Sequence, residues 1–253
     1  MKTLFMGQNA IHLKSVDSTN SYATELLRQN SIPEGSLIYT FEQTNGRGQR
    51  GNYWESEPNK NIALSLILYP SFLNADKQYL LTKIISLAVA DLMAEILEYS
   101  EKTGKVKIKW PNDIYIGAKK IGGILIENSW RENSIQNSVV GIGININQTQ
   151  FKTTDNSISL ALIASRQFDL MDIIEQLCAF IEARYLQLKA NKLGNIDFAY
   201  LQRLYRLDTW NHFSSNNEMF EGKITGVSDS GKLQVFMKSN ETKEFDLKEI
   251  VFI

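Results

Sequence analysis

Residues 43–54 read Gln-Thr-Asn-Gly-Arg-Gly-Gln-Arg-Gly-Asn-Tyr-Trp, and the rest of the chain is arranged around this stretch. Three glycines there are interleaved with Arg47 and Arg50. Inside a helix or strand each glycine costs about 1 kcal/mol relative to alanine, so the pattern predicts a mobile loop. Guanidinium groups and successive backbone amides bind carboxylates and phosphates, which makes this loop a candidate anion site. The alternative is a solvated turn between two strands, with both arginines merely on the surface.

Apolar residues on both sides of the loop predict two strands. Residues 37–41 lead directly into the loop, and residues 62–68 follow it and stop before Pro70. The connection between these strands is about twenty residues long. Because a connection of that length inside a compact domain usually has a function, the pattern predicts a functional loop or lid.

The remaining pattern up to residue 205 mixes strands with helices and predicts an α+β domain. Ser18 or Thr19 can cap a helix that ends at Asn30. Apolar spacings of three and four predict a long core helix that begins at Ala75 and is closed by Gly104. The other expected elements are helices at residues 171–188 and 197–205, and strands at residues 11–14, 106–110, 114–116, 119–127 and 139–146.

The last part of the chain changes in character. Short strands separated by turns rich in serine, asparagine and glycine are expected at residues 220–227, 232–237, 242–246 and 249–252. They predict a small all-β module, a barrel, that packs on the larger domain because so few strands bury little apolar surface alone. The predicted division is therefore residues 1–205 and residues 206–253.

The composition excludes several classes of protein. With 27 basic and 28 acidic residues among 253, the net charge is −1, which argues against a general nucleic-acid or membrane-surface binder. The one cysteine, Cys178, excludes an internal disulfide and lies in an amphipathic pattern that indicates a buried structural thiol. No apolar run approaches the roughly 18 residues of a membrane span. The expected setting is the cytoplasm.

Four polar clusters stand at predicted strand ends or helix starts: residues 17–20, 43–54, 109–113 and 119–123. Each has a purely structural alternative, since Ser-Thr-Asn is a common helix cap and Trp-Pro-Asn-Asp could be a turn with a buried tryptophan. Gly141 and Gly143 interrupt the predicted strand 139–146. Glycines in a strand mark close approach of a ligand or backbone, although a bulge or tight packing needs them equally.

Together these motifs resemble one family, the biotin–protein ligases. The chain contains, in order, Ser18-Thr19-Asn20, Gly46-Arg47-Gly48-Gln49-Arg50-Gly51 with Trp54, Lys109-Trp110-Pro111-Asn112-Asp113, Lys120-Ile121-Gly122-Gly123-Ile124-Leu125 and Gly143-Ile144-Asn145. Within residues 11–147 the resemblance rests on these motifs. For the C-terminal module it rests only on the arrangement, a small β module that follows the larger domain. It implies a mixed β-sheet flanked by helices, the class II synthetase-like catalytic domain of biotin and lipoyl ligases, followed by an SH3-like β-barrel.

The resemblance also implies a two-step reaction in one site. The carboxylate of biotin attacks the α-phosphate of ATP, accompanied by Mg²⁺, and gives biotinyl-5′-AMP and pyrophosphate. A lysine of a biotin carboxyl carrier protein or domain then attacks the mixed anhydride and releases AMP. No covalent enzyme intermediate is needed, in keeping with the lack of a credible Ser/His/Asp or Cys/His set in the sequence.

The same resemblance suggests roles for individual residues. Lys120 and Arg47 would be catalytic, with Lys120 at the biotin carbonyl and the phosphate and Arg47 at the carboxylate or phosphate. Trp54 would stack on adenine, and Asp113 would bind Mg²⁺. The expected biotin-binding residues are Ser18, Thr19, Asn20, Gln43, Gly46, Arg47, Gly48, Gln49, Lys120 and Gly123. The expected ATP- or adenylate-binding residues are Arg50, Trp54, Asn112, Asp113, Lys120 and Asn145.

The chain departs from the common form of the family in its loop. Gln49 stands where many members have arginine, and Asn52 stands where a basic residue is usual. The loop therefore carries less positive charge, which predicts weaker retention of biotinyl-AMP unless Arg50 compensates. The first motif begins at Ser18 and leaves no room for a DNA-binding helix-turn-helix, so we expect no transcriptional function. Exposed edge strands would permit a homodimer.

Two other functions compete with this interpretation. A lipoate–protein ligase shares the fold and the adenylation chemistry, but the Gly-Arg-Gly and Lys-Trp-Pro-Asn-Asp strings favour biotin. A non-catalytic biotin- or adenylate-binding regulatory module is the second alternative. Lys120 and the arginine-containing loop would be superfluous for biotin binding alone, because biotin needs no phosphate neutralisation.

Overall fold

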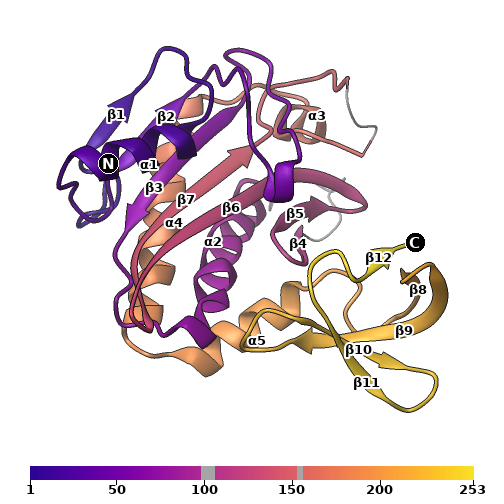
Figure 1. Ribbon diagram of the computed structural model, residues 1–253. Coiled ribbons are helices and arrows are strands. Elements are labelled where there is room, and N and C mark those ends of the chain that lie inside the picture. Colours follow the sequence, from indigo (N-terminus) through magenta and orange to yellow (C-terminus); the bar gives the residue numbers. More distant parts are fainter. Residues whose placement is uncertain (98–105, 153–155) are drawn as a thin grey trace.

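The larger part of the protein is built on a seven-stranded mixed sheet (Figure 1). The structure is a computed structural model that describes residues 1–97, 106–152 and 156–253, without the side chain of Arg50. The expected helix end at Gly104 therefore lies outside the described residues. The strands of the sheet are β1 (Ala10–His12), β2 (Leu37–Thr40), β3 (Ile62–Leu68), β4 (Val106–Lys109), β5 (Asp113–Ile116), β6 (Lys119–Arg131) and β7 (Ser134–Ile144).

The strands follow the spatial order β1-β2-β3-β7-β6-β5-β4. β1 pairs with β2 in parallel, and every other neighbouring pair is antiparallel. The prediction of a mixed sheet flanked by helices is confirmed. The loop after residue 40 joins β2 to β3, which are adjacent in the sheet as its second and third strands.

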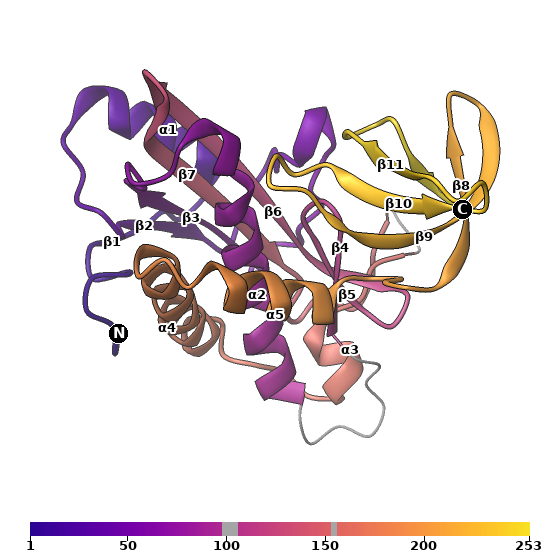
Figure 2. The same ribbon diagram turned by 90° about the horizontal axis from the view of Figure 1, so that it is seen from below.

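Helices cover both faces of this sheet (Figures 1 and 2). α1 (Thr19–Gln29) packs on β3 and β7, whereas α2 (Tyr79–Leu97) packs on β4, β5 and β6 from the opposite face. α4 (Leu170–Lys189) and α5 (Leu193–Arg203) pack against α2. All seven residues of β3 are buried, because a central strand covered on both sides cannot alternate between core and water. Among the described residues, no helix has the length and apolar character needed to cross a membrane.

Several predicted boundaries were wrong for local reasons. β6 and β7 form a longer hairpin than expected, because their polar outer residues carry no apolar pattern. α2 begins at Tyr79, after a single 3₁₀ turn at Ala75–Lys77. The short helix α3 (Leu160–Ala164), capped by the Ser159 side chain, was not predicted. Cys178 is fully buried and burial raises its pKa to about 12, so the structural interpretation of this thiol is confirmed.

The C-terminal module is a five-stranded antiparallel sheet of order β11-β10-β9-β8-β12. Its strands are β8 (Trp210–Ser215), β9 (Glu218–Val227), β10 (Leu233–Met237), β11 (Thr242–Phe245) and β12 (Val251–Phe252). β8 was missed because its sequence, Trp-Asn-His-Phe-Ser-Ser, is mostly polar. β11 and β12 lie at opposite edges, and in the described part of the chain no pairing between them closes the predicted barrel. The division at residues 205 and 206 stays a prediction.

The module is fastened to the larger domain beside the turn that joins β4 to β5. The indole Nε1 of Trp110 donates a 2.9 Å hydrogen bond to the backbone oxygen of Gly231 in the β9–β10 turn. The Tyr79 hydroxyl donates to the Pro111 oxygen at 2.9 Å and also lies 2.9 Å from the hydroxyl of Tyr200. These three bonds, one buried and two partly buried, join α2, α5, the β4–β5 turn and the module.

We predict that Trp110→Phe lowers the free energy of unfolding by about 1–3 kcal/mol, because it leaves the Gly231 carbonyl without its donor. Urea denaturation followed by circular dichroism measures this loss. Trp130→Phe is the matched control, since Trp130 is 42% exposed at the end of β6. Equal stability of the two variants would contradict the proposed fastening.

Candidate active site

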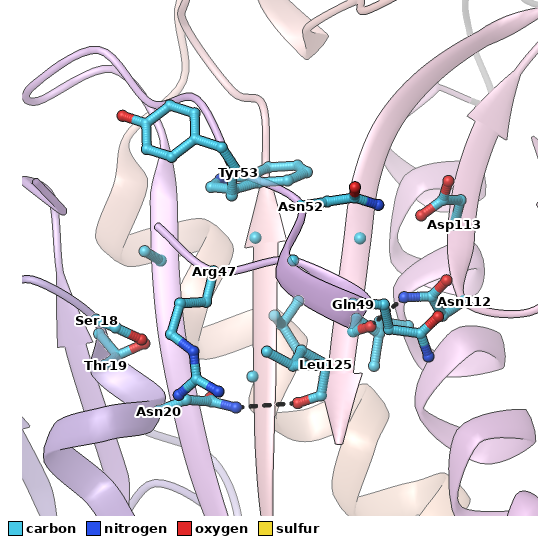
Figure 3. A pocket seen from close by; sticks show the side chains of 18 of the residues that line it. Ser18, Thr19, Asn20, Arg47, Gln49, Asn52, Tyr53, Asn112, Asp113 and Leu125 are labelled. Carbon is cyan, nitrogen blue, oxygen red and sulfur yellow. Dashed lines mark hydrogen bonds between the residues drawn. The ribbon is translucent and has the colours of Figure 1, made fainter. Parts of the chain in front are cut away.

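A cavity of about 250 Å³ lies on the face of the sheet that α1 covers (Figure 3). Its walls come from the N-terminus of α1, the loop 43–54, strands β3, β6 and β7, and the β4–β5 turn. Twelve of the residues expected from the sequence line it: Ser18, Thr19, Asn20, Gln43, Arg47, Gly48, Gln49, Trp54, Asn112, Asp113, Lys120 and Gly123. Residues from four separate sequence clusters therefore meet in one cavity.

Of the three other expected residues, two are described by the structure and do not line this wall. Gly46 and Asn145 do not line the cavity, and the side chain of Arg50 lies outside the described structure. Asn145 is buried, and its amide donates to the Ile158 oxygen at 3.2 Å, so it braces the segment that follows β7. Gly46 supports the loop instead, because a Cβ at this position would lie 2.4 Å from the Trp54 oxygen.

The loop 43–54 is a short hairpin laid over the cavity. The Trp54 amide donates to the Gly46 oxygen at 2.9 Å, and the Gly48 amide donates to the Asn52 oxygen at 2.6 Å. At its base, the Thr44 and Asn45 amides donate to the backbone just before α1, at Val16 and Asp17. The base of the loop is thereby joined to the start of α1.

One end of the cavity is lined by neutral hydrogen-bonding groups. Ser18 caps α1 and accepts a 3.4 Å bond from the Ser21 amide. The side-chain oxygen of Gln43 accepts from the Thr19 amide at 3.0 Å and lies 3.4 Å from the Thr19 hydroxyl. The buried Ser65 hydroxyl lies 2.8 Å from the Thr19 hydroxyl and donates to Asn20 Oδ1 at 2.6 Å. Since none of these groups is ionised, this end suits an uncharged polar ligand group.

The sequence analysis missed Glu127, which lies on β6 behind this neutral end. Its carboxylate is 2.8 Å from Arg47 Nη2 and accepts a 2.8 Å bond from Asn20 Nδ2. The other Arg47 nitrogen, Nη1, donates to the Ser21 hydroxyl at 3.1 Å. The Arg47 guanidinium therefore points toward Asn20 and away from Asp113 (Figure 3), and its charge is balanced within the protein.

The opposite end of the cavity is charged. Lys120 Nζ lies 2.7 Å from a carboxylate oxygen of Asp113 and 5.5 Å from the centre of the Trp54 ring. Asn112 donates from its side chain to the Ile124 oxygen and accepts from the Ile124 amide through its backbone, which fixes the β4–β5 turn on β6. This end combines an ammonium group, a carboxylate and an aromatic ring.

Lys109 and Tyr115 lie just outside the charged end. Burial lowers the pKa of Lys109, whereas the nearby carboxylate of Asp113 opposes this shift. Its ammonium lies 5.1 Å from the centre of the Tyr115 ring and 5.0 Å from that of Phe252 in the C-terminal module. Burial, together with the Asp113 charge, raises the pKa of Tyr115 to about 12, so this phenol stays neutral.

The floor of the cavity depends on two glycines of β7. A Cβ at Gly141 would lie 2.3 Å from Asn20 Oδ1, and one at Gly143 would lie 2.5 Å from the Trp54 ring. Both side chains therefore rest directly on bare strand backbone. Trp54 Nε1 is buried there and has no hydrogen-bond partner among the described residues. Of the two interpretations of these glycines, the structure supports tight packing, because protein side chains are the groups that lie against them.

Other cavity residues had no sequence signal. Leu247, from the turn between β11 and β12, lines the cavity, so the C-terminal module contributes to its wall. Tyr53 borders the cavity with 56% of its side chain exposed. Leu64, Leu125 and Ile142 supply apolar surface between the two ends. Their apolar character in predicted strands predicted burial but gave no indication of which face would meet a ligand.

The donor set fits a magnesium ion only together with phosphates. Among the described residues, Asp113 is the one carboxylate that lines the cavity, and no group of three or more His, Cys, Asp or Glu side chains could hold a metal ion. Mg²⁺ commonly uses one or two protein carboxylates and completes its shell with phosphate oxygens and water. Asp113 therefore fits an ion that arrives with a nucleotide.

We predict that Gly143→Ala lowers the free energy of unfolding by about 1–3 kcal/mol, because the added methyl group displaces the Trp54 ring. Urea denaturation measures the effect. Gly194→Ala is the control: no atom lies within 4 Å of the added Cβ in α5, and alanine is the better helix former. Equal stability of Gly143→Ala and the wild type would contradict the packing described.

Comparison with known proteins agrees with the fold. A family model described as the biotin/lipoate A/B protein ligase family matches residues 12–145. The bifunctional ligase/repressor BirA of Bacillus subtilis is 31% identical over 245 residues, which cover 95% of this chain and 73% of that protein. The biotin–[acetyl-CoA-carboxylase] ligase of Paracoccus denitrificans is 33% identical over 134 residues, which cover 53% of each chain.

The fold also matches a solved enzyme. The biotin protein ligase of Aquifex aeolicus, solved in complex with biotin and ATP, has a TM-score of 0.79 and 25% identity, covering 97% of this chain and 99% of that one. The family model and the Bacillus relative extend over most of the strands and helices that build the cavity. On its sequence and its fold together, the chain belongs to the biotin/lipoate A/B protein ligase family.

Proposed function

We propose that the protein is an ATP-dependent biotin–protein ligase. It joins the carboxylate of biotin to the α-phosphate of ATP, forming biotinyl-5′-AMP and releasing pyrophosphate. It then transfers the biotinyl group to the ε-amine of one lysine of a biotin carboxyl carrier domain and releases AMP. The names of the relatives, one solved with biotin and ATP and another named for acetyl-CoA carboxylase, support this reaction.

The observation that carries the proposal is the division of one cavity into a neutral end and a charged end. Ser18 and Thr19 lie at one side of the cavity, and Asn112 and Asp113 lie at the other (Figure 3). A ligand with an uncharged polar head, an apolar body and a carboxylate that reacts with a phosphate fits this division. A site for biotin alone would not need the Lys120–Asp113 pair at the far end.

The neutral end matches the ureido ring of biotin, which has one carbonyl oxygen and two N–H groups. Thr19 Oγ1 and Gln43 Oε1 can accept from the N–H groups, and the Ser18 hydroxyl can donate to the carbonyl. Both amide hydrogens of Asn20 are already used, by Leu125 and Glu127, so Asn20 offers only its oxygen. Such a site rejects analogues without the ureido group, because its own polar groups would be left unpaired.

The charged end is where the first step would occur. A carboxylate that approaches a triphosphate needs positive charge to stabilise the pentacoordinate transition state, and Lys120 is our candidate for this role. Its 2.7 Å contact with Asp113 orients the ammonium in the cavity before substrates bind. Mg²⁺, when bound with ATP, neutralises phosphate charge, and Asp113 would hold it.

The roles of the remaining expected residues are also proposals. One side of the Trp54 ring lies against Gly143 and Gly123, so adenine would stack on the other side. Asn112 lines the cavity and would contact the nucleotide, whereas Asn145 would act only indirectly. Gln49, which is expected to bind biotin, also lines the cavity. For Arg47 to bind the ligand carboxylate or phosphate, its pair with Glu127 would have to open.

The size of the cavity bears on the proposed lid. A volume of about 250 Å³ is small for a ligand pocket, since typical pockets hold about 300–1,000 Å³. Biotin together with a nucleotide needs more room, so the loop 43–54 would move outward when ATP binds.

We place the reaction in the cytoplasm. Homodimer formation and the lack of operator binding stay predictions.

We expect the protein with biotin and Mg-ATP to exchange pyrophosphate into ATP and to add one biotinyl group to a carrier domain. Radiolabel exchange and intact-protein mass spectrometry measure the two steps. Lys120→Gln should reduce exchange by about 10²–10³-fold, as when other transition-state donors are removed. No exchange and no adduct with the wild type would refute the proposed function.

The same exchange assay separates the alternatives. Lipoate in place of biotin should give no exchange, because it lacks the ureido group that the neutral end is built to bind. Exchange with lipoate alone would make the protein a lipoate ligase. Binding of biotin without any exchange would make it a non-catalytic regulatory module.

We predict that Gln49→Arg slows release of biotinyl-AMP by about tenfold, because an arginine at the cavity wall adds a charge-assisted bond to the adenylate. Rapid filtration of enzyme loaded with labelled adenylate gives the release rate. Gln136→Arg adds the same charge at an exposed position of β7 and is the control. If release from Gln49→Arg equals release from the wild type, the missing arginine does not govern retention.

A further inference from the structure

We propose that Glu127 is a positioning residue for the biotin end of the site. Its carboxylate holds Arg47 of the loop and Asn20 of α1 at the same time, and so fastens the loop to β6. This inference rests on the proposed function and assigns Arg47 a different role from contact with the reacting groups. It predicts that the Arg47–Glu127 pair governs biotin affinity and not the rate of the chemical step.

The first support is a continuous chain of hydrogen bonds around the neutral end. It begins at Gln43, at the base of the loop, and passes through Thr19 and Ser65 to Asn20. From Asn20 it continues through Glu127 to Arg47, which returns to the loop four residues after Gln43. The loop is thus attached on both sides of Gly46, through Gln43 and through Arg47. Glu127 is the residue that connects Arg47 to the rest of this chain of hydrogen bonds.

The second support is the bonding of Asn20. Its two amide hydrogens go to the Leu125 oxygen at 3.2 Å and to Glu127 at 2.8 Å, and its oxygen accepts from Ser65. Glu127 therefore acts together with the Leu125 carbonyl and Ser65 to hold the amide in one orientation. A carboxylate partner makes that bond charge-assisted and stronger than a neutral one. An amide turned the other way would present hydrogens to Ser65 and disturb the contacts of Thr19.

The third support is the charge balance of Arg47. Its side chain is 46% exposed and that of Glu127 is 34% exposed, so an isolated pair here would contribute little. The pair gains its effect from the network, because both partners also bind α1, through Ser21 and Asn20 respectively. Because the charge of Arg47 is balanced by Glu127 at the neutral end, Lys120 is the cation that faces the phosphates at the charged end of the cavity.

Hydrogen exchange of the ligand-free protein tests the fastening directly. Glu127→Gln and Arg47→Gln should each speed exchange of the loop amides of residues 46–54 by about tenfold, because each variant opens the same pair. Glu25→Gln is the control, since Glu25 pairs with Arg28 on the exposed surface of α1. Loop exchange equal to the wild type in both Glu127→Gln and Arg47→Gln would overturn the proposal, whatever the outcome of the biotin experiments.

Binding of biotin and of biotin methyl ester, measured by calorimetry without ATP, tests the role of Arg47. We expect each single variant to bind both ligands about tenfold more weakly, and the double variant to be no weaker than either single one. In steady-state assays of Glu127→Gln, the KM for biotin should rise while kcat at saturating biotin stays within about twofold. Circular dichroism and Tm verify that each variant is folded.

Two results would overturn the inference. If Arg47→Gln weakens binding of biotin but not of its methyl ester, Arg47 contacts the carboxylate itself. If Glu127→Gln binds biotin like the wild type, the pair does not position the site. Failure of the wild type to bind biotin would instead refute the proposed function, while the exchange experiment would still decide whether Glu127 fastens the loop.

Discussion

Two side chains of the site rest on the bare backbone of a single strand, and most of the cavity depends on that contact. Asn20 lies on β7 at Gly141, and Trp54 lies on it at Gly143. Asn20 lies at the start of α1 and Trp54 at the end of the loop. The helix and the loop therefore contact the same face of β7, at positions two residues apart. Any larger residue at either glycine would lift one wall of the cavity.

Electrostatics divides the cavity that this packing creates. Arg47 and Glu127 balance each other at the neutral end, and Lys120 and Asp113 form a second pair at the other. The two pairs differ in surroundings, because the first is bound into a network with α1 whereas the second faces the cavity wall formed by Trp54. A ligand with a neutral head and a reactive carboxylate would therefore be oriented along the cavity.

The C-terminal module contributes to the site, although it comes after the larger domain in the sequence. Trp110 and Phe252 join the β4–β5 region to the module, and Leu247 reaches the cavity wall. The turn that carries Asn112 and Asp113 is therefore held from two sides, by β6 and by the module. This arrangement makes the geometry of the charged end depend on the docking of two separate sheets.

The α+β class and the strands around the loop follow from local periodicity in the sequence. Twelve of the residues that line the cavity were expected because short motifs resemble those of the biotin–protein ligases. The sequence did not predict β8, because its residues are mostly polar. It did not predict α3 either, because a helix of five residues is too short to show a periodic pattern. The pairing of Glu127 with Arg47 could not be predicted, because the two residues are 80 positions apart and meet only through the order of the strands in the sheet. The reason is physical: spacing along the chain specifies local conformation, whereas the partner of a charge depends on which distant elements pack together.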